Sequence, residues 1–178
     1  MSVISRSWLA FAAIGAGVIH LALVISSSLP IAIMLVIFGI AEMVWGALIL
    51  IKDRLVMPRA AQAGALSPLI LWSLLTVVAT LLNNPEIATT LRFVPMAIAA
   101  LFELFIASVL SVHRRRCVNP KHLPREVKPA SAVRYLSAIL LAGMLVGGLT
   151  SPALAATQAG AVASQHGGTM GGMMDMGH

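Results

Sequence analysis

The end of the chain gathers side chains that can bind a soft metal ion. Four methionines and two histidines fall within the last thirteen residues, separated mostly by glycine: His166, Met170, Met173, Met174, Met176 and His178. Thioether sulfur prefers Cu(I), and imidazole nitrogen accepts either state of copper. Thioethers also bind without losing a proton. The residue types therefore predict a copper-binding segment with Cu(I) as the preferred ion.

This segment resembles the Met/His-rich segments of bacterial extracytoplasmic copper-resistance proteins. The resemblance covers residues 166–178 and implies capture of copper outside the cytoplasm. Two other interpretations stay open, namely a sink for oxidants and a biased chain end that binds nothing.

A second set of polar residues lies within strongly apolar stretches. Glu42 stands ten residues before Lys52, and Glu103 stands ten residues before His113. At 1.5 Å per residue both carboxyl groups would lie about 15 Å from the same boundary, near the middle of a bilayer. An ionisable group at that depth normally faces the interior of a bundle and has a partner. His20 would lie within about 5 Å of the depth of Glu42, so we expect these two to be able to meet.

Several roles remain open for these groups. His20, Glu42 and Glu103 could form a metal or proton pathway, with the thioethers of Met34 and Met96 nearer the outer ends of their helices. A quinone or haem contact is another possibility. Alternatively, the acids could be neutral and hydrogen-bond to hydroxyl groups of other helices, for which the sequence offers Ser73, Thr76, Thr80 and Ser108.

The composition indicates that these residues belong to a membrane protein. The chain has 178 residues, of which 59 % are apolar and 10 % charged, and its mean hydropathy is +0.95. These values exclude an ordinary soluble domain. Apolar runs of about 20 residues predict five transmembrane helices, at about 8–28, 29–51, 66–82, 93–112 and 135–155. The fold class is thus an all-α polytopic membrane bundle over 1–155, with a flexible extracytoplasmic tail over 156–178.

Turn residues predict how the spans pair. Pro30 suits the first turn of a new helix just after the break between spans one and two, and Pro85 plays the same part between spans three and four. We therefore expect two tandem antiparallel hairpins followed by a single helix. Small residues should allow the helices to pack closely inside the bundle: Gly15, Gly17, Gly39, Gly46, Gly143, Gly147 and Gly148. Gly143 and Gly147 also loosely match a helix-dimer motif, so a homodimer through this helix is the alternative.

The basic residues predict the orientation. With five spans, eleven of the twelve Lys and Arg residues fall on one side and only Arg92 falls on the other. The positive-inside rule then places the N-terminus in the cytoplasm and the tail outside a bacterial plasma membrane. The net charge of +6 is therefore explained by basic loops on the cytoplasmic side of the membrane. No nucleic-acid partner is expected. The fifth span also has the layout of a signal sequence, with Ala153-Leu154-Ala155 as a small-x-small cleavage pattern, and both outcomes export the tail.

These observations lead to one functional expectation and one alternative. The first is a copper-binding membrane protein in copper homeostasis or delivery, whose partners are the lipid bilayer and a copper acceptor. The alternative is an accessory or assembly subunit of a larger membrane complex, such as a respiratory oxidase. No catalytic motif is present in the sequence, so no enzymatic activity is expected.

Overall fold

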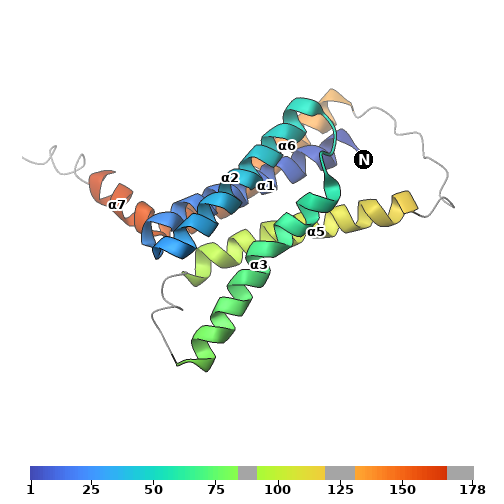
Figure 1. Cartoon of the computed structure of the whole chain (residues 1–178). Coiled ribbons are helices and arrows are strands. Elements are labelled where there is room, and N and C mark those ends of the chain that lie inside the picture. Colours follow the sequence, from blue (N-terminus) through green and yellow to red (C-terminus); the bar gives the residue numbers. More distant parts are fainter. Residues whose placement is uncertain (84–91, 119–130, 168–178) are drawn as a thin grey trace, which may run out of the picture.

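The computed structural model describes residues 1–83, 92–118 and 131–167 (Figure 1). Five helices in these ranges are long and apolar enough to cross a membrane, which confirms the predicted all-α bundle. They are α1 (Val3–Leu23) with its short 3-10 continuation η1 (Val24–Ser26), α2 (Leu29–Lys52), α3 (Pro58–Leu81), α5 (Phe93–Val118) and α6 (Ala132–Ala155). The protein is thus a multi-pass helical membrane protein.

Several helices are longer than the predicted spans. Helix α1 begins at Val3 instead of residue 8, α3 begins at Pro58 instead of residue 66, and α5 runs to Val118 instead of residue 112. Apolar runs predict the lipid-facing part of a helix, whereas the helix itself ends where caps or water satisfy its backbone groups. At α1, for example, the Ser2 hydroxyl accepts a hydrogen bond from the Ser5 amide at 3.2 Å.

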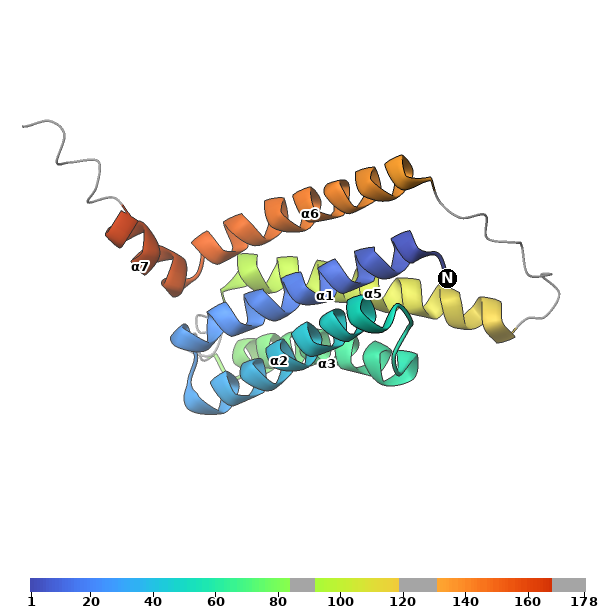
Figure 2. The ribbon, with the colours of Figure 1, turned by 90° about the horizontal axis from the view of Figure 1, so that it is seen from above.

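Helix α1 lies in the middle of the bundle and contacts α2, α5 and α6 (Figure 2). The apolar window of α1 is 56 % buried and that of α5 is 50 % buried, whereas α2, α3 and α6 reach only 22 %, 17 % and 11 %. Helices α1 and α5 therefore form the core. The apolar surfaces that α2, α3 and α6 leave open suit contact with lipid.

Small residues let α1 and α2 approach closely. A Cβ atom added to Gly17 would lie 2.7 Å from the carbonyl oxygen of Gly39, and one added to Gly39 would lie 2.9 Å from that of Gly17. Farther along the same hairpin, a Cβ on Gly46 would lie 2.9 Å from the Ala10 carbonyl oxygen. The prediction of close packing is confirmed for this hairpin, because the two backbones touch where any side chain would intrude.

Helix α6 does not use its glycines in this way. A Cβ added to Gly143, Gly147 or Gly148 would have no neighbour within 4 Å. The expectation that these three residues pack inside the bundle is wrong, whereas the alternative of a dimer through Gly143 and Gly147 stays a prediction. The other side of α6 makes the contact instead, through Ala142 and Ala153, which are fully buried.

Helices α1, α3 and α6 begin, and α2 and α5 end, at the same end of the bundle (Figure 2). Most basic residues of the described chain belong to these helix ends by their position in the sequence. Arg6 pairs there with Asp53 at 2.5 Å, and Arg114 donates a hydrogen bond to Gln62 Oε1 at 2.8 Å. At the opposite end, Arg92 donates to the Ala156 carbonyl at 2.6 Å. Each of these contacts joins two helices or their ends.

Part of the segment assigned to the tail is helical, because Gln158–Gly167 forms a further helix, α7. Thr157 is fully buried and starts the helix, since its hydroxyl accepts a hydrogen bond from the Gly160 amide at 3.2 Å. Helix α7 packs near η1 and α1, at the end of the bundle opposite to the basic residues (Figure 1). The remainder of the predicted tail, residues 168–178, lies outside the described residues.

We predict that Gly17→Ala destabilises the protein by about 1–3 kcal/mol, because the new methyl group would overlap the backbone of α2. Thermal unfolding in detergent would measure this loss. Gly147→Ala is the matched control, since its methyl group would meet nothing in the described bundle and alanine favours a helix. Equal unfolding temperatures for the two variants would contradict the packing described here.

Candidate intramembrane site

His20 lies inside the bundle, between α2 and α5. It belongs to the last turn of α1, and its side chain is fully buried. Phe38 of α2 packs against it, with 6.5 Å between the ring centroids. A buried imidazole must find partners for both ring nitrogens, because no water reaches this position.

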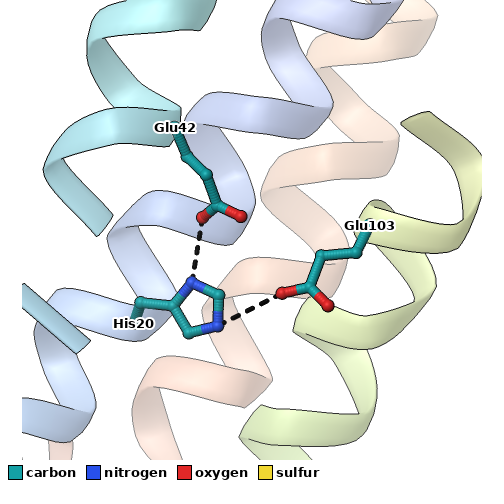
Figure 3. A group of neighbouring side chains, drawn as sticks. All are labelled: His20, Glu42 and Glu103. Carbon is teal, nitrogen blue, oxygen red and sulfur yellow. Dashed lines mark hydrogen bonds and ion pairs between the residues drawn. The ribbon is translucent and has the colours of Figure 1, made fainter. Parts of the chain in front are cut away.

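Glu42 on α2 faces one of these nitrogens (Figure 3). Its Oε2 atom forms a hydrogen bond of 2.9 Å with His20 Nδ1, and its side chain is 11 % exposed. Gly17 and Gly39 each lie three residues before one of the two partners, so the close contact of the backbones is one turn away. Helix packing thus brings His20 and Glu42 together, as their depths in the sequence predicted.

Glu103 on α5 faces the other nitrogen of the same ring (Figure 3). Its Oε1 atom lies 3.3 Å from His20 Nε2, and the side chain is only 1 % exposed. The two atoms are close enough for an electrostatic contact but lack hydrogen-bond geometry, so both are left without a hydrogen-bond partner. Glu42 Oε1 is likewise buried and without a partner. We call His20, Glu42 and Glu103 the His–Glu–Glu cluster.

The His–Glu–Glu cluster has the composition of a cation site. One ligand atom from each residue can be chosen so that all three lie within 4.8 Å of one another. Imidazole nitrogen and carboxylate oxygen are common ligands of transition metals. Buried polar atoms without partners are costly, and a bound cation or a shared proton would satisfy them. The geometry therefore suits a metal ion or a proton passed from one carboxyl group through the ring to the other.

Three of the four hydroxyl groups suggested by the sequence as partners bond elsewhere, and the fourth, Ser108, is exposed on α5. The hydroxyl groups of Ser73, Thr76 and Thr80 each donate to the carbonyl oxygen four residues earlier in α3, at 2.8 Å. None of the three bonds to a glutamate. These residues instead satisfy the backbone of their own helix.

Met34 and Met96 both line one pocket, which contains none of the three cluster residues in its lining. This pocket, of about 150 Å³, is formed by α2, α3 and α5 and also receives Phe38 and Trp72. Trp72 was not among the candidates from the sequence, because one tryptophan in an apolar helix gives no sign of what it faces. Of the six predicted tail ligands, His166 lies in α7, and Met170, Met173, Met174, Met176 and His178 lie outside the described residues.

Comparison with protein-family models, curated proteins and solved structures finds no match for this chain. The fold and the His–Glu–Glu cluster alone describe the chain, as a helical multi-pass membrane protein with a buried ionisable site.

We predict that His20→Leu costs about 3–5 kcal/mol of stability, because it leaves two carboxyl groups buried without the imidazole between them. The triple variant His20→Leu, Glu42→Leu and Glu103→Leu should recover most of this loss, since it removes all three polar groups together. Chemical unfolding in detergent micelles would compare the two. If the triple variant loses the sum of three independent changes, the residues are not a coupled group.

Proposed function

We propose that the protein binds copper in a bacterial plasma membrane and serves copper homeostasis or delivery. The observation that carries this proposal is the buried imidazole with a carboxyl group on each side, contributed by three different helices. The Met/His-rich tail supports copper as the metal, because thioether sulfur has little use for zinc and prefers Cu(I).

Charge explains why a cation would enter the His–Glu–Glu cluster. A charged group at the centre of a bilayer costs about 2.5–3.5 kcal/mol on insertion scales. Two carboxylates next to a neutral imidazole would carry two negative charges, of which Cu(I) cancels one. With one of the two carboxyl groups protonated, Cu(I) would cancel the single remaining charge. His20, Glu42 and Glu103 would supply the ligands from three different helices. The cluster would thus be a metal-binding site within the membrane.

The orientation proposed for the bundle places the tail outside the cytoplasm. Basic residues at one end of the described helices agree with the loop charges, which favour a cytoplasmic location of that end. Helix α7 and the residues that follow it are then extracytoplasmic. The tail would capture copper there and pass it to an acceptor protein or into the bundle.

We predict that purified full-length protein retains copper and that Glu42→Gln with Glu103→Gln weakens binding at the cluster by at least about tenfold, as for loss of groups that support a metal. Intact mass and metal analysis of detergent-extracted protein, loaded under reducing conditions, would measure the stoichiometry. Asp53→Asn is the matched control, because this acid is exposed and pairs with Arg6 at the basic end.

A second full-length variant separates the cluster from the tail. Replacing Met170, Met173, Met174 and Met176 with leucine should remove the metal bound by the tail and leave that bound by the cluster. A copper content that neither set of substitutions changes would overturn the proposal. Proton transfer through the cluster would become the better explanation if the wild-type protein binds no metal and the two glutamines abolish a proton flux across vesicles.

We also predict that a reporter fused after His178 is active only outside the cytoplasm, because five spans and the charge bias together export the tail. A pair of reporters, one active in the cytoplasm and one active outside it, would measure this. The same pair inserted between Lys52 and Pro58 should give the reverse result. A cytoplasmic location of His178 would remove the role proposed for the tail.

The runner-up function is that of an accessory or assembly subunit of a larger membrane complex. The observation in its favour is the open side of α6, where Gly143, Gly147 and Gly148 have no neighbour in the described bundle and another helix could pack. Purification in mild detergent discriminates the two functions. Stoichiometric partners without bound copper would favour the subunit, and copper bound by an isolated chain would favour the first proposal.

A further inference from the structure

A pocket beside the His–Glu–Glu cluster has different chemistry from the cluster itself. It has a volume of about 150 Å³ and only apolar, aromatic or thioether side chains around it. Those that matter here are Met34 and Phe38 of α2, Trp72 of α3 and Met96 of α5. Met96 is 4 % exposed, whereas Met34 is 40 % exposed, so one thioether lies inside and the other lies at the opening.

The pocket continues towards the end of the bundle at which α7 lies. Pro30 and Ile31, in the first turn of α2, belong to its lining. Met34 stands eight residues before Glu42, and Met96 stands seven residues before Glu103, which places the thioethers about 10–12 Å above the carboxyl groups along their helices. Phe38 lines the pocket and also packs on the ring of His20. Phe38 therefore contacts both sites.

The lining of this pocket suits a soft ion of single charge. Two thioethers are soft ligands, and the face of an indole ring attracts a cation. No carboxylate lines the pocket to balance a second charge. Because the cost of removing an ion from water rises with the square of its charge, a monovalent ion would enter such an uncharged site far more easily than a divalent one.

The last described helix lies at the end of the bundle towards which the pocket continues. Helix α7 has ten residues and packs near η1, which directly precedes α2. Pro30 and Ile31 of the pocket lining follow η1 within a few residues. The chain that carries the tail methionines therefore leaves the described bundle at this same end.

We propose that the pocket of Met34, Met96 and Trp72 is an entry site for a soft monovalent cation, Cu(I) or its analogue Ag(I), between the tail and the His–Glu–Glu cluster. This inference rests on the function proposed above and adds a second site of thioether character. The tail captures the ion, the pocket receives it, and the cluster holds it deeper in the membrane.

The test uses Ag(I), which resembles Cu(I) in softness and charge but undergoes no change of oxidation state under these conditions. Full-length protein with the four tail methionines replaced by leucine is titrated with Ag(I) while tryptophan emission is recorded. The expected result is a saturable change in emission that Trp72→Phe removes, because Trp8 and Trp45 do not line the pocket. Zn(II) at the same concentration should give no such change.

Two substitutions then locate the ligands. Met34→Leu with Met96→Leu should weaken the Ag(I) response at least tenfold and preserve the fold, since leucine and methionine have similar volumes. Met144→Leu is the control, because Met144 is 67 % exposed on α6 and lies outside the pocket. An unchanged Ag(I) response in the double variant, or a response that persists in Trp72→Phe, would overturn the entry site.

Failure of the entry site can be distinguished from failure of the proposed function. Copper retained by the cluster, together with no Ag(I) response from Trp72, would refute the pocket alone. An Ag(I) response that depends on Met34 and Met96, in a protein whose Glu42→Gln and Glu103→Gln variant binds as much copper as wild type, would refute the cluster alone.

Discussion

The structure depends on how polar side chains are accommodated where water is absent. His20 is fully buried in α1, and its two ring nitrogens face carboxyl groups from α2 and α5. In a bilayer each such group must be satisfied by another protein group or by an ion, and only the packed bundle supplies these partners. The cluster thus requires α1 to be central, and it fixes the rotation of α2 and α5 about their own axes.

Close packing of the first hairpin makes this arrangement possible. Gly17 and Gly39 remove the side chains that would hold α1 and α2 apart, one turn before His20 and Glu42. The pairing of the imidazole and the carboxyl group at 2.9 Å is therefore a consequence of the glycines as well as of the charged residues. Attraction between helices in lipid comes from such packing and from hydrogen bonds, because lipid tails already solvate apolar side chains.

The sequence predicts how deep a residue lies in the membrane better than it predicts which side of its helix faces the other helices. Runs of apolar residues located all five transmembrane helices, and counting residues from their ends placed Glu42 and Glu103 at similar depth. The same counting could not show that Glu103 faces His20, because this depends on how α5 rotates against α1. For the same reason, Gly143 and Gly147 were expected inside the bundle although they face away from it.

Local hydrogen bonding explains the other differences from expectation. Thr76 and its neighbours in α3 have the right chemistry to bond to a buried acid, but the carbonyl groups one turn earlier are closer. At the start of the tail, the buried Thr157 caps α7, so that residues 158–167 are helical despite their small side chains. Composition alone does not reveal such caps when a preceding helix must end next to them.

The two proposed sites differ in charge as well as in ligand type, which would set the order in which an ion visits them. An uncharged pocket of thioethers would accept an ion without an opposite charge to hold it, whereas the two carboxyl groups of the cluster would attract a cation once they had lost their protons. The same oxygen atoms, Glu42 Oε1 and Glu103 Oε1, are those left without a partner. A proton and a metal ion would compete for them, because a carboxyl group must release its proton to become a ligand. If the cluster binds a cation as proposed, release of that cation would therefore be coupled, on chemical grounds, to the return of a proton to these acids.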